Sequence, residues 1–278
     1  MISTGEERII RLSSKGSLFT VNNGVTLILE KNITLRGRNN NDKSVVEIYE
    51  YGTLIMNKGS HITDNISSSN GGGVYIRNNG TFNLNGGKIT ANILSSDYSS
   101  GGGVYISGGI FNMNDGEISE NMSSYSGGGV YITNNGTFTM NGGKIYSNTS
   151  SAQYYPDGGG VSIFKGIFIM NNGEIINNTS LTSSSTAYGG GVYVSSNGIF
   201  SMFGGSTFSK TGGGIIYGNG SNTIYRNLVR SNSGTIYDNS GHAVYATGGG
   251  STKRMEITVG SEMDLYYNND TFGGDWDY

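Results

Sequence analysis

The chain has 278 residues, of which 48 are glycine and one is proline, and its formal net charge is -3 at pH 7. Glycine follows no every-third-residue period, which excludes a collagen-like rod, and the scattered charges form no basic stripe, so nucleic-acid binding is not expected. The sequence contains no cysteine, which excludes disulfides and thiolate metal ligands. Because valine, isoleucine, phenylalanine and tyrosine supply much of the apolar content, we expect a folded, β-rich protein.

The two ends of the chain differ from its middle. The start, MISTGEERII, lacks the basic and then apolar order of a signal peptide, and no apolar run approaches about 18 residues, so no direct membrane insertion is expected. We expect residues 1–23 to form an N-terminal cap or lead-in and residues 24–250 to form repeats. Residues 251–278, which hold Trp276, are expected to form a C-terminal cap or tail.

A glycine triplet followed by valine recurs along the middle of the chain. The triplets begin 26 to 31 residues apart, at Gly71, Gly101, Gly127, Gly158 and Gly189, and a degenerate copy begins at Gly241. A period of this length predicts a stacked repeat, because one unit cannot bury its own apolar face. We expect the glycines to form corners where the chain bends sharply.

Each repeat contains three short stretches with strand-like alternation. In the unit 127–148 the residues expected to face inward are Val130, Ile132, Phe138, Met140 and Ile145. The third stretch ends in an asparagine three residues after its isoleucine. We expect these asparagines to form a buried ladder of side-chain amides, with the rungs Asn65, Asn92, Asn121, Asn148, Asn178, Asn219 and Asn239.

Two arrangements are compatible with three short strands per unit. Asn-Gly pairs such as Asn79-Gly80 favour hairpins, and hence a meander or a propeller blade. The residue before the ladder isoleucine alternates in charge through Lys88, Glu117, Lys144 and Glu174. Stacked in parallel, these residues would face neighbours of opposite sign, whereas like charges directly opposite each other would destabilise the sheet. The charges therefore favour a parallel β-solenoid.

The coil pattern GGGVYI…GTFTMNGGKIYSN resembles the right-handed parallel β-helices of bacterial surface adhesins. It is similar to the repeats of polymorphic outer-membrane proteins, with GGGV in place of GGA-I/L/V and I-x-x-N in place of F-x-x-N, and the resemblance covers roughly residues 24–250. It implies a pectin-lyase-like, all-β fold. The expected architecture is a single-stranded right-handed parallel β-helix of about eight coils of three short strands, with terminal caps.

Tyrosines recur at the outward position of the first strand of each coil. These candidate ligand-binding residues are Tyr75, Tyr105, Tyr131, Tyr193 and Tyr245. An exposed file of tyrosines would offer ring faces and hydroxyls to a glycan or a protein; alternatively, the rings only strengthen contacts between coils. The loops before the triplets, at 93–100, 149–157 and 179–188, vary in length and composition, as binding loops on one face of a solenoid do.

The expected function is that of a secreted or cell-surface adhesin-like module that binds glycans or the proteins of a host or neighbouring cell. One alternative is a structural subunit of an extracellular fibre or surface layer that self-associates through the solenoid ends. A second is a polysaccharide lyase or hydrolase, since many such enzymes share the β-helix. The aspartates are spread along the chain and form no acid pair, so no catalytic residue, metal site or cofactor is expected.

Overall fold

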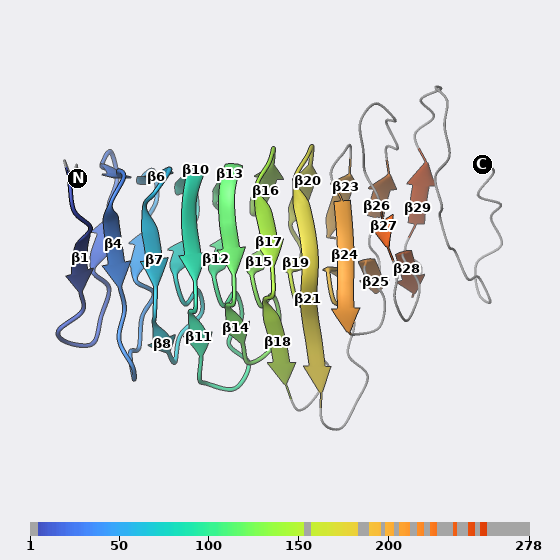
Figure 1. Cartoon of the computed structure of the whole chain (residues 1–278). Coiled ribbons are helices and arrows are strands. Elements are labelled where there is room, and N and C mark those ends of the chain that lie inside the picture. The colour runs from blue at the N-terminus through green and yellow to red at the C-terminus, as the bar shows by residue number, and fades with distance from the viewer. Residues whose placement is uncertain are drawn as a thin grey trace.

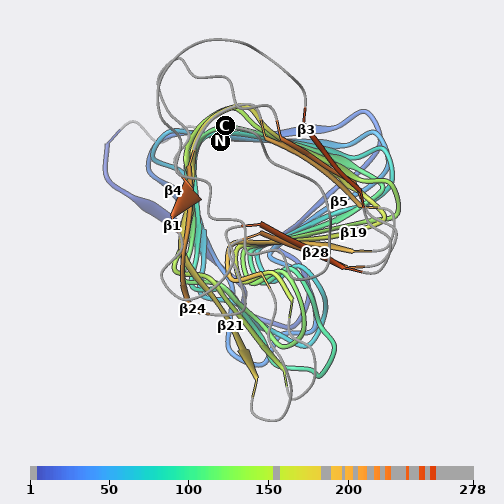
Figure 2. The same cartoon turned by 90° about the vertical axis from the view of Figure 1, so that its right-hand side faces the viewer.

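In the computed structural model, the chain forms an all-β parallel β-solenoid of about six turns (Figure 1). The structure describes residues 5–152, 157–182, 189–195 and 198–202, and the backbone of six further strands at 206–211, 216–219, 223–226, 236–237, 244–247 and 251–254. Seen from its end, the solenoid shows successive coils lying over one another around a common core (Figure 2).

All pairings among the described strands are parallel, and they form two sheets. The expected parallel stack is therefore confirmed, and a hairpin meander or propeller blade is excluded for this part of the chain. The smaller sheet contains the strands that follow the glycine triplets and has nine members: β2 (Phe19–Val21), β5 (Val46–Ile48), β9 (Val74–Ile76), β12 (Val104–Ser107), β15 (Val130–Thr133), β19 (Val161–Phe164), β22 (Val192–Ser195), β25 (Ile216–Asn219) and β28 (Val244–Thr247).

The larger sheet collects the remaining strands of every coil. It has twenty members: β1 (Arg8–Arg11), β3 (Thr26–Leu29), β4 (Ile33–Arg36), β6 (Thr53–Asn57), β7 (His61–Thr63), β8 (Ile66–Ser67), β10 (Thr81–Thr90), β11 (Ile93–Leu94), β13 (Ile110–Ser119), β14 (Met122–Ser123), β16 (Thr137–Met140), β17 (Lys144–Tyr146), β18 (Thr149–Ala152), β20 (Ile167–Met170), β21 (Glu174–Thr182), β23 (Ile199–Met202), β24 (Ser206–Thr211), β26 (Thr223–Arg226), β27 (Ile236–Tyr237) and β29 (Ser251–Arg254).

The first two strands lie in the segment expected to form a cap or lead-in. β1 pairs in register with β4, and β2 pairs in register with β5, so both sheets already begin within this segment. At the other end, β29 pairs with β26. The tail that follows, residues 255–278, lies outside the described residues.

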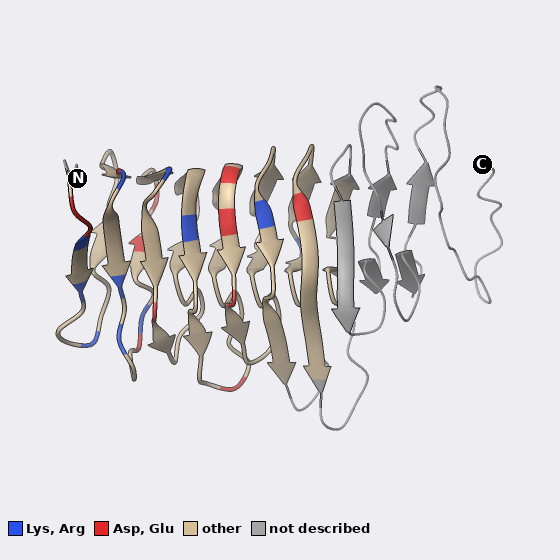
Figure 3. Ribbon diagram, viewed as in Figure 1, with Lys and Arg blue, Asp and Glu red and all other residues tan. Residues whose placement is uncertain are grey.

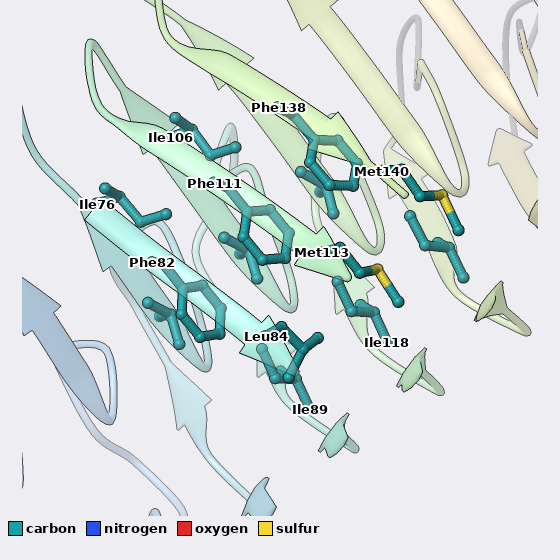
Figure 4. Close-up of a cluster of buried hydrophobic side chains, with 14 of the residues drawn as sticks. Ile76, Phe82, Leu84, Ile89, Ile106, Phe111, Met113, Ile118, Phe138 and Met140 are labelled. Carbon is teal, nitrogen blue, oxygen red and sulfur yellow. The ribbon is translucent and has the colours of Figure 1, made fainter. Parts of the chain in front are cut away.

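The core contains files of identical or similar side chains that run along the solenoid axis. In the unit 127–148, the predicted inward residues Val130, Ile132, Phe138, Met140 and Ile145 are all 0% exposed, which confirms the predicted alternation. The phenylalanines stack nearly parallel: the Phe138 ring centroid lies 4.6 Å from that of Phe111 and 4.6 Å from that of Phe168. Figure 4 shows the repeated pattern in three successive coils. Because identical or similar side chains stack on one another, the interior is filled while each coil keeps the same backbone path.

The glycine triplets form the predicted corners, for two physical reasons. Their first residues have positive φ, for example +71° at Gly101 and +65° at Gly127, a region that side chains with a Cβ rarely adopt. At the second residue neighbouring coils approach closely, and a Cβ on Gly102 would lie 2.4 Å from the carbonyl oxygen of Gly128. Another residue would therefore separate the coils at this corner.

The buried asparagine ladder is present and is continuous through four coils. The Nδ2 atom of each rung donates to the Oδ1 atom of the next, with N–O distances of 3.0 Å from Asn92 to Asn121, Asn121 to Asn148 and Asn148 to Asn178. The backbone N–H of each donating rung bonds to the same oxygen. The Oδ1 atoms of Asn121, Asn148 and Asn178 therefore each accept two bonds from the preceding coil.

The ladder changes its pattern at its first member. Asn65 donates to the carbonyl oxygens of Lys43 and Gly72 instead of to the next rung, and its Oδ1 accepts from Asn41, a buried asparagine that the repeat pattern does not predict. In consequence, the buried Oδ1 of Asn92 has no hydrogen-bond partner among the described residues. The ladder is therefore interrupted between Asn65 and Asn92.

One predicted rung is wrong and another cannot be placed. The register of β25 pairs Ile216 with Val192 and Asn219 with Ser195, so Asn219 belongs to the nine-stranded sheet and does not follow the third strand of a coil. Asn239 lies outside the described residues. The physical reason for the error is an extra isoleucine after the triplet, in GGGIIYGN, which creates a second I-x-x-N match in another register.

Candidate functional site

The predicted tyrosines lie in one file on the nine-stranded sheet. Backbone register pairs Tyr75 with Tyr105, Tyr105 with Tyr131, Tyr131 with Ser162, and Ser162 with Tyr193. The next strands continue this register with Tyr217 and Tyr245. Tyr217 was not among the predicted residues because the extra isoleucine places it three residues after the glycine triplet instead of two. The parallel fold therefore brings the predicted tyrosines together at one position in successive coils.

The tyrosine rings pack against each other and are covered more than the sequence predicts. The centroids of Tyr75 and Tyr105 are 4.9 Å apart with an interplanar angle of 73°, and those of Tyr105 and Tyr131 are 5.2 Å apart at 17°. These three side chains are half-buried, and Tyr193 is only 5% exposed. In this part of the file the rings cover one another, as in the alternative in which they strengthen contacts between coils, and Ser162 separates Tyr131 from Tyr193.

Burial makes these phenols harder to ionise. It raises the pKa of Tyr105 to about 12 and raises the pKa of Tyr131 further. Both hydroxyls are therefore neutral at physiological pH, where they can donate and accept hydrogen bonds. This part of the face offers neutral hydroxyls and ring edges to a ligand.

A charged cluster lies at the amino-terminal end of the file. The guanidinium carbon of Arg77 lies 4.4 Å from the ring centroid of Tyr75 and 4.7 Å from that of Tyr49, within cation–π range. Arg77 Nη2 lies 3.1 Å from an oxygen of Glu47, which takes the tyrosine position in the preceding coil and is almost fully buried. Arg77 therefore neutralises Glu47 and extends the aromatic surface.

Two loop tyrosines lie near the Tyr131 end of the file. The rings of Tyr98 and Tyr125 meet edge to face with centroids 5.6 Å apart, and Tyr98 is 74% exposed. Asp157 forms an isolated parallel bridge with Ser126 and lies close enough to Tyr131 to help raise the pKa of that phenol. We call the group Tyr75, Tyr98, Tyr105, Tyr125 and Tyr131 the aromatic face. Within the aromatic face Tyr98 supplies an exposed ring, whereas Tyr75, Tyr105 and Tyr131 are half-buried.

Asp157 has an unusual environment for a carboxylate. Its side chain is 9% exposed, and one carboxyl oxygen has no hydrogen-bond partner among the described residues. Burial raises its pKa from 3.8 to about 8, so this side chain is largely neutral at pH 7. Neither Asp157 nor Arg77 stands out in the sequence, because no motif distinguishes them from other surface charges.

The structure and the comparisons define the class of this protein only at the level of its fold: a parallel β-solenoid with asparagine ladders. No family model, curated protein or solved structure matches the chain. Among the described residues there is no group of three or more histidine, cysteine or acidic side chains arranged to hold a metal ion. No described helix has the length and apolarity to cross a membrane.

Proposed function

We propose that this chain is a binding module of adhesin type, located outside the cell or on its surface, that contacts a glycan or a protein through the aromatic face. In this proposal the solenoid is a right-handed β-helix with three short strands in each of about eight coils. The observation that carries the proposal is the placement of the exposed Tyr98 beside Tyr125 and the ordered file of Tyr75, Tyr105 and Tyr131.

The rigidity of this face favours binding. Tyrosine provides contact area and a polar hydroxyl with few rotatable bonds, and the packed file has already lost most of its side-chain freedom. A ligand that contacts several coils would gain from multivalency, because each further contact forms within one complex. The variable segments 93–100, 149–157 and 179–188 precede the strands of this sheet and would set specificity. They were predicted to be loops throughout, but each begins as a strand, namely β11, β18 and the end of β21.

A binding screen with glycans and host proteins tests the proposal, using the double variant Tyr98→Ser/Tyr125→Ser. The matched control is Tyr146→Ser, because Tyr146 is a partly buried tyrosine on β17 of the other sheet. We expect the wild-type chain and the control to bind the same ligand and the double variant to lose at least tenfold in affinity. Equal binding by all three proteins would contradict the proposal, as would filament formation with no binding to any glycan or protein.

A further inference from the structure

A second surface feature lies on the twenty-stranded sheet, at the corner where the third strand stretch of each coil ends. A hollow of about 640 Å³ is lined there by residues from the segments 12–13, 36–39, 64–66 and 91–93, which belong to four successive coils. We call it the Arg38 hollow. Its volume lies within the range of about 300–1,000 Å³ that is typical of small-molecule sites, and it shares no residue with the aromatic face.

The backbone of Arg38 is anchored on the asparagine ladder. Gly37 passes directly over the buried rung Asn65, so close that a Cβ on Gly37 would lie 2.4 Å from the Cβ of Asn65. The N–H of Arg38 donates to Asn65 Oδ1 at 3.4 Å, and its carbonyl oxygen accepts from the N–H of Ile66 at 3.0 Å. The position of Arg38 at the rim of the hollow is therefore set by the next coil.

The guanidinium group of Arg38 is oriented but only partly used. Its Nε donates to the carbonyl oxygen of Asn39 at 3.3 Å, and its Nη1 donates to that of Ser13 at 3.1 Å. An arginine side chain has five N–H groups, so three remain without a partner among the described residues, including both on Nη2. No described acidic side chain lies within ion-pair distance of Arg38. The free N–H groups can bind a carboxylate through two parallel hydrogen bonds.

Polar side chains farther along the same sheet are paired with the neighbouring coil. Lys88 Nζ lies 3.0 Å from Glu117 Oε2, and Lys144 Nζ lies 2.8 Å from Glu174 Oε2. This confirms the predicted alternation of charge, visible as blue and red bands on β10, β13, β17 and β21 (Figure 3). A file of exposed amides is paired in the same way, since each donates Nδ2 to the Oδ1 of the asparagine one coil earlier at 2.8–3.2 Å: Asn85, Asn114, Asn141 and Asn171. The guanidinium of Arg38 differs from these groups because no side chain compensates its charge.

The hollow as a whole lacks one negative charge. Its second arginine, Arg36, is neutralised by Asp64, whose Oδ2 lies 2.5 Å from Arg36 Nη2 and 2.6 Å from Arg36 Nε. Two arginines and one aspartate are the charged residues of its lining, which gives a net charge of +1. A ligand with a single anionic group would therefore be attracted to Arg38 and would leave the Arg36–Asp64 pair intact.

Apolar side chains line the hollow beside this charge. Leu12, Ile66, Ala91 and Ile93 are all partly buried, and Ile66 pairs in register with Ile93. Two coil intervals separate Arg38 from Ile93, a distance of roughly 10 Å along the solenoid axis. The strands β4, β7 and β11 are each paired on both sides, so an extended peptide has no open edge there to join as a further strand. The lining thus suits a ligand with one anionic end and an apolar chain.

We propose that the Arg38 hollow binds the anion of a medium-chain fatty acid. The carboxylate accepts two hydrogen bonds from the guanidinium of Arg38, and the acyl chain lies along the solenoid axis over Ile66 and Ile93. An extended chain advances by roughly 1.2 Å per bond, so the distance from Arg38 to Ile93 corresponds to about eight bonds, close to the length of decanoate. This assignment goes beyond the adhesive function and does not depend on it.

Isothermal titration calorimetry with octanoate, decanoate and the neutral 1-decanol, all below the concentration at which they aggregate, tests this assignment. The test variants are Arg38→Gln and Ile93→Thr. Their matched controls are Arg8→Gln, at an exposed arginine of β1, and Ile55→Thr, at a partly buried isoleucine of β6, both outside the hollow. Circular dichroism verifies that the variants are folded.

The charge and the chain should each leave a separate signature. We expect wild-type protein to bind decanoate at least about tenfold more tightly than 1-decanol, and Arg38→Gln to lose this preference. Each methylene that is fully buried should tighten binding by about fourfold, so decanoate should exceed octanoate, and Ile93→Thr should weaken this dependence on chain length. Both controls should match the wild type.

Three outcomes would overturn the assignment: no binding of decanoate, equal affinity for decanoate and 1-decanol, or unchanged decanoate binding in Arg38→Gln. Capture of the protein by vesicles of phosphatidylcholine and phosphatidylglycerol, with no binding of free decanoate, would overturn it in favour of a membrane surface. The aromatic-face variant Tyr98→Ser/Tyr125→Ser is expected to bind decanoate as tightly as the wild type. Loss of decanoate binding in this variant but not in Arg38→Gln would place the ligand on the aromatic face and overturn the assignment to the hollow.

Discussion

The asparagine ladder allows a quantitative prediction about stability, for the variant Asn148→Ala. Asn148 is fully buried and takes part in four hydrogen bonds through its side chain. It accepts from the backbone N–H and the Nδ2 of Asn121, and it donates to Asn178 Oδ1 and to the carbonyl oxygen of Ile118, all at 2.8–3.0 Å. Alanine removes all four and leaves a space too enclosed for free exchange with solvent.

The expected cost follows from the groups that lose their partners. The backbone N–H of Asn121 and the Nδ2 hydrogen that bonds to Asn148 lose their acceptor. Asn121 Nδ2 keeps its other bond, to the carbonyl oxygen of Ile89, and Asn178 Oδ1 keeps the backbone N–H of residue 148. Each buried polar group without a partner costs about 1–3 kcal/mol, so we expect the free energy of unfolding to fall by roughly 2–6 kcal/mol.

The same coil contains a matched control, Asn141→Ala. Asn141 also donates its amide to the preceding coil, at 2.9 Å, but it is exposed, so water replaces the lost partner. We expect a cost of at most about 1 kcal/mol. Urea denaturation followed by far-ultraviolet circular dichroism measures both variants. Coincident unfolding curves for the two would refute the argument that burial gives the ladder its energetic role.

Three further predictions concern single side chains. Asp157→Asn should abolish a pH dependence of stability. Because burial raises the folded-state pKa from 3.8 to about 8, the wild type is expected to lose stability between about pH 4 and pH 8, by at most about 6 kcal/mol. Denaturation at pH 5 and pH 8 measures this slope. Phe138→Ala opens a cavity between two stacked rings and should lower the free energy of unfolding by about 3–5 kcal/mol; a loss below about 1 kcal/mol in urea titration would contradict the packing. Ala91→Gly should raise stability by about 0.5–1 kcal/mol, because Ala91 has a φ of 54°, and an unchanged or lower melting temperature would speak against strain there.

The main features of the fold could be predicted because they depend on local repetition. The alternation of Phe138 and Met140 with polar residues determines which side of the strand is buried. The opposite charges of Lys88 and Glu117 favour a parallel arrangement in which the two residues are neighbours. The phenylalanine stack and the ion pair are both contacts between equivalent positions of adjacent coils. The error at Asn219 has the same origin, since a short motif was matched without its register.

The proposed binding surface was harder to predict because it depends on contacts between non-equivalent positions. Strand alternation shows that Tyr131 points away from the core, but it contains no information about its burial or about the nearby Tyr125 and Asp157. The hollow along Gly59, Gly86, Gly116, Gly143 and Gly173 was missed because sequences such as Asn141-Gly142-Gly143 are typical of turns. The hollow forms only when the same turn recurs in every coil.

The two asparagine files have opposite polarity along the solenoid axis. In the buried file each donor points toward the carboxyl end of the chain, from Asn92 to Asn121, whereas in the exposed file it points toward the amino end, from Asn114 to Asn85. An α-helix adds every peptide dipole in one direction and accumulates charge at its ends. Here the amide dipoles of the buried file oppose those of the exposed file, so further coils lengthen the rod without building up an axial electric field from its asparagines.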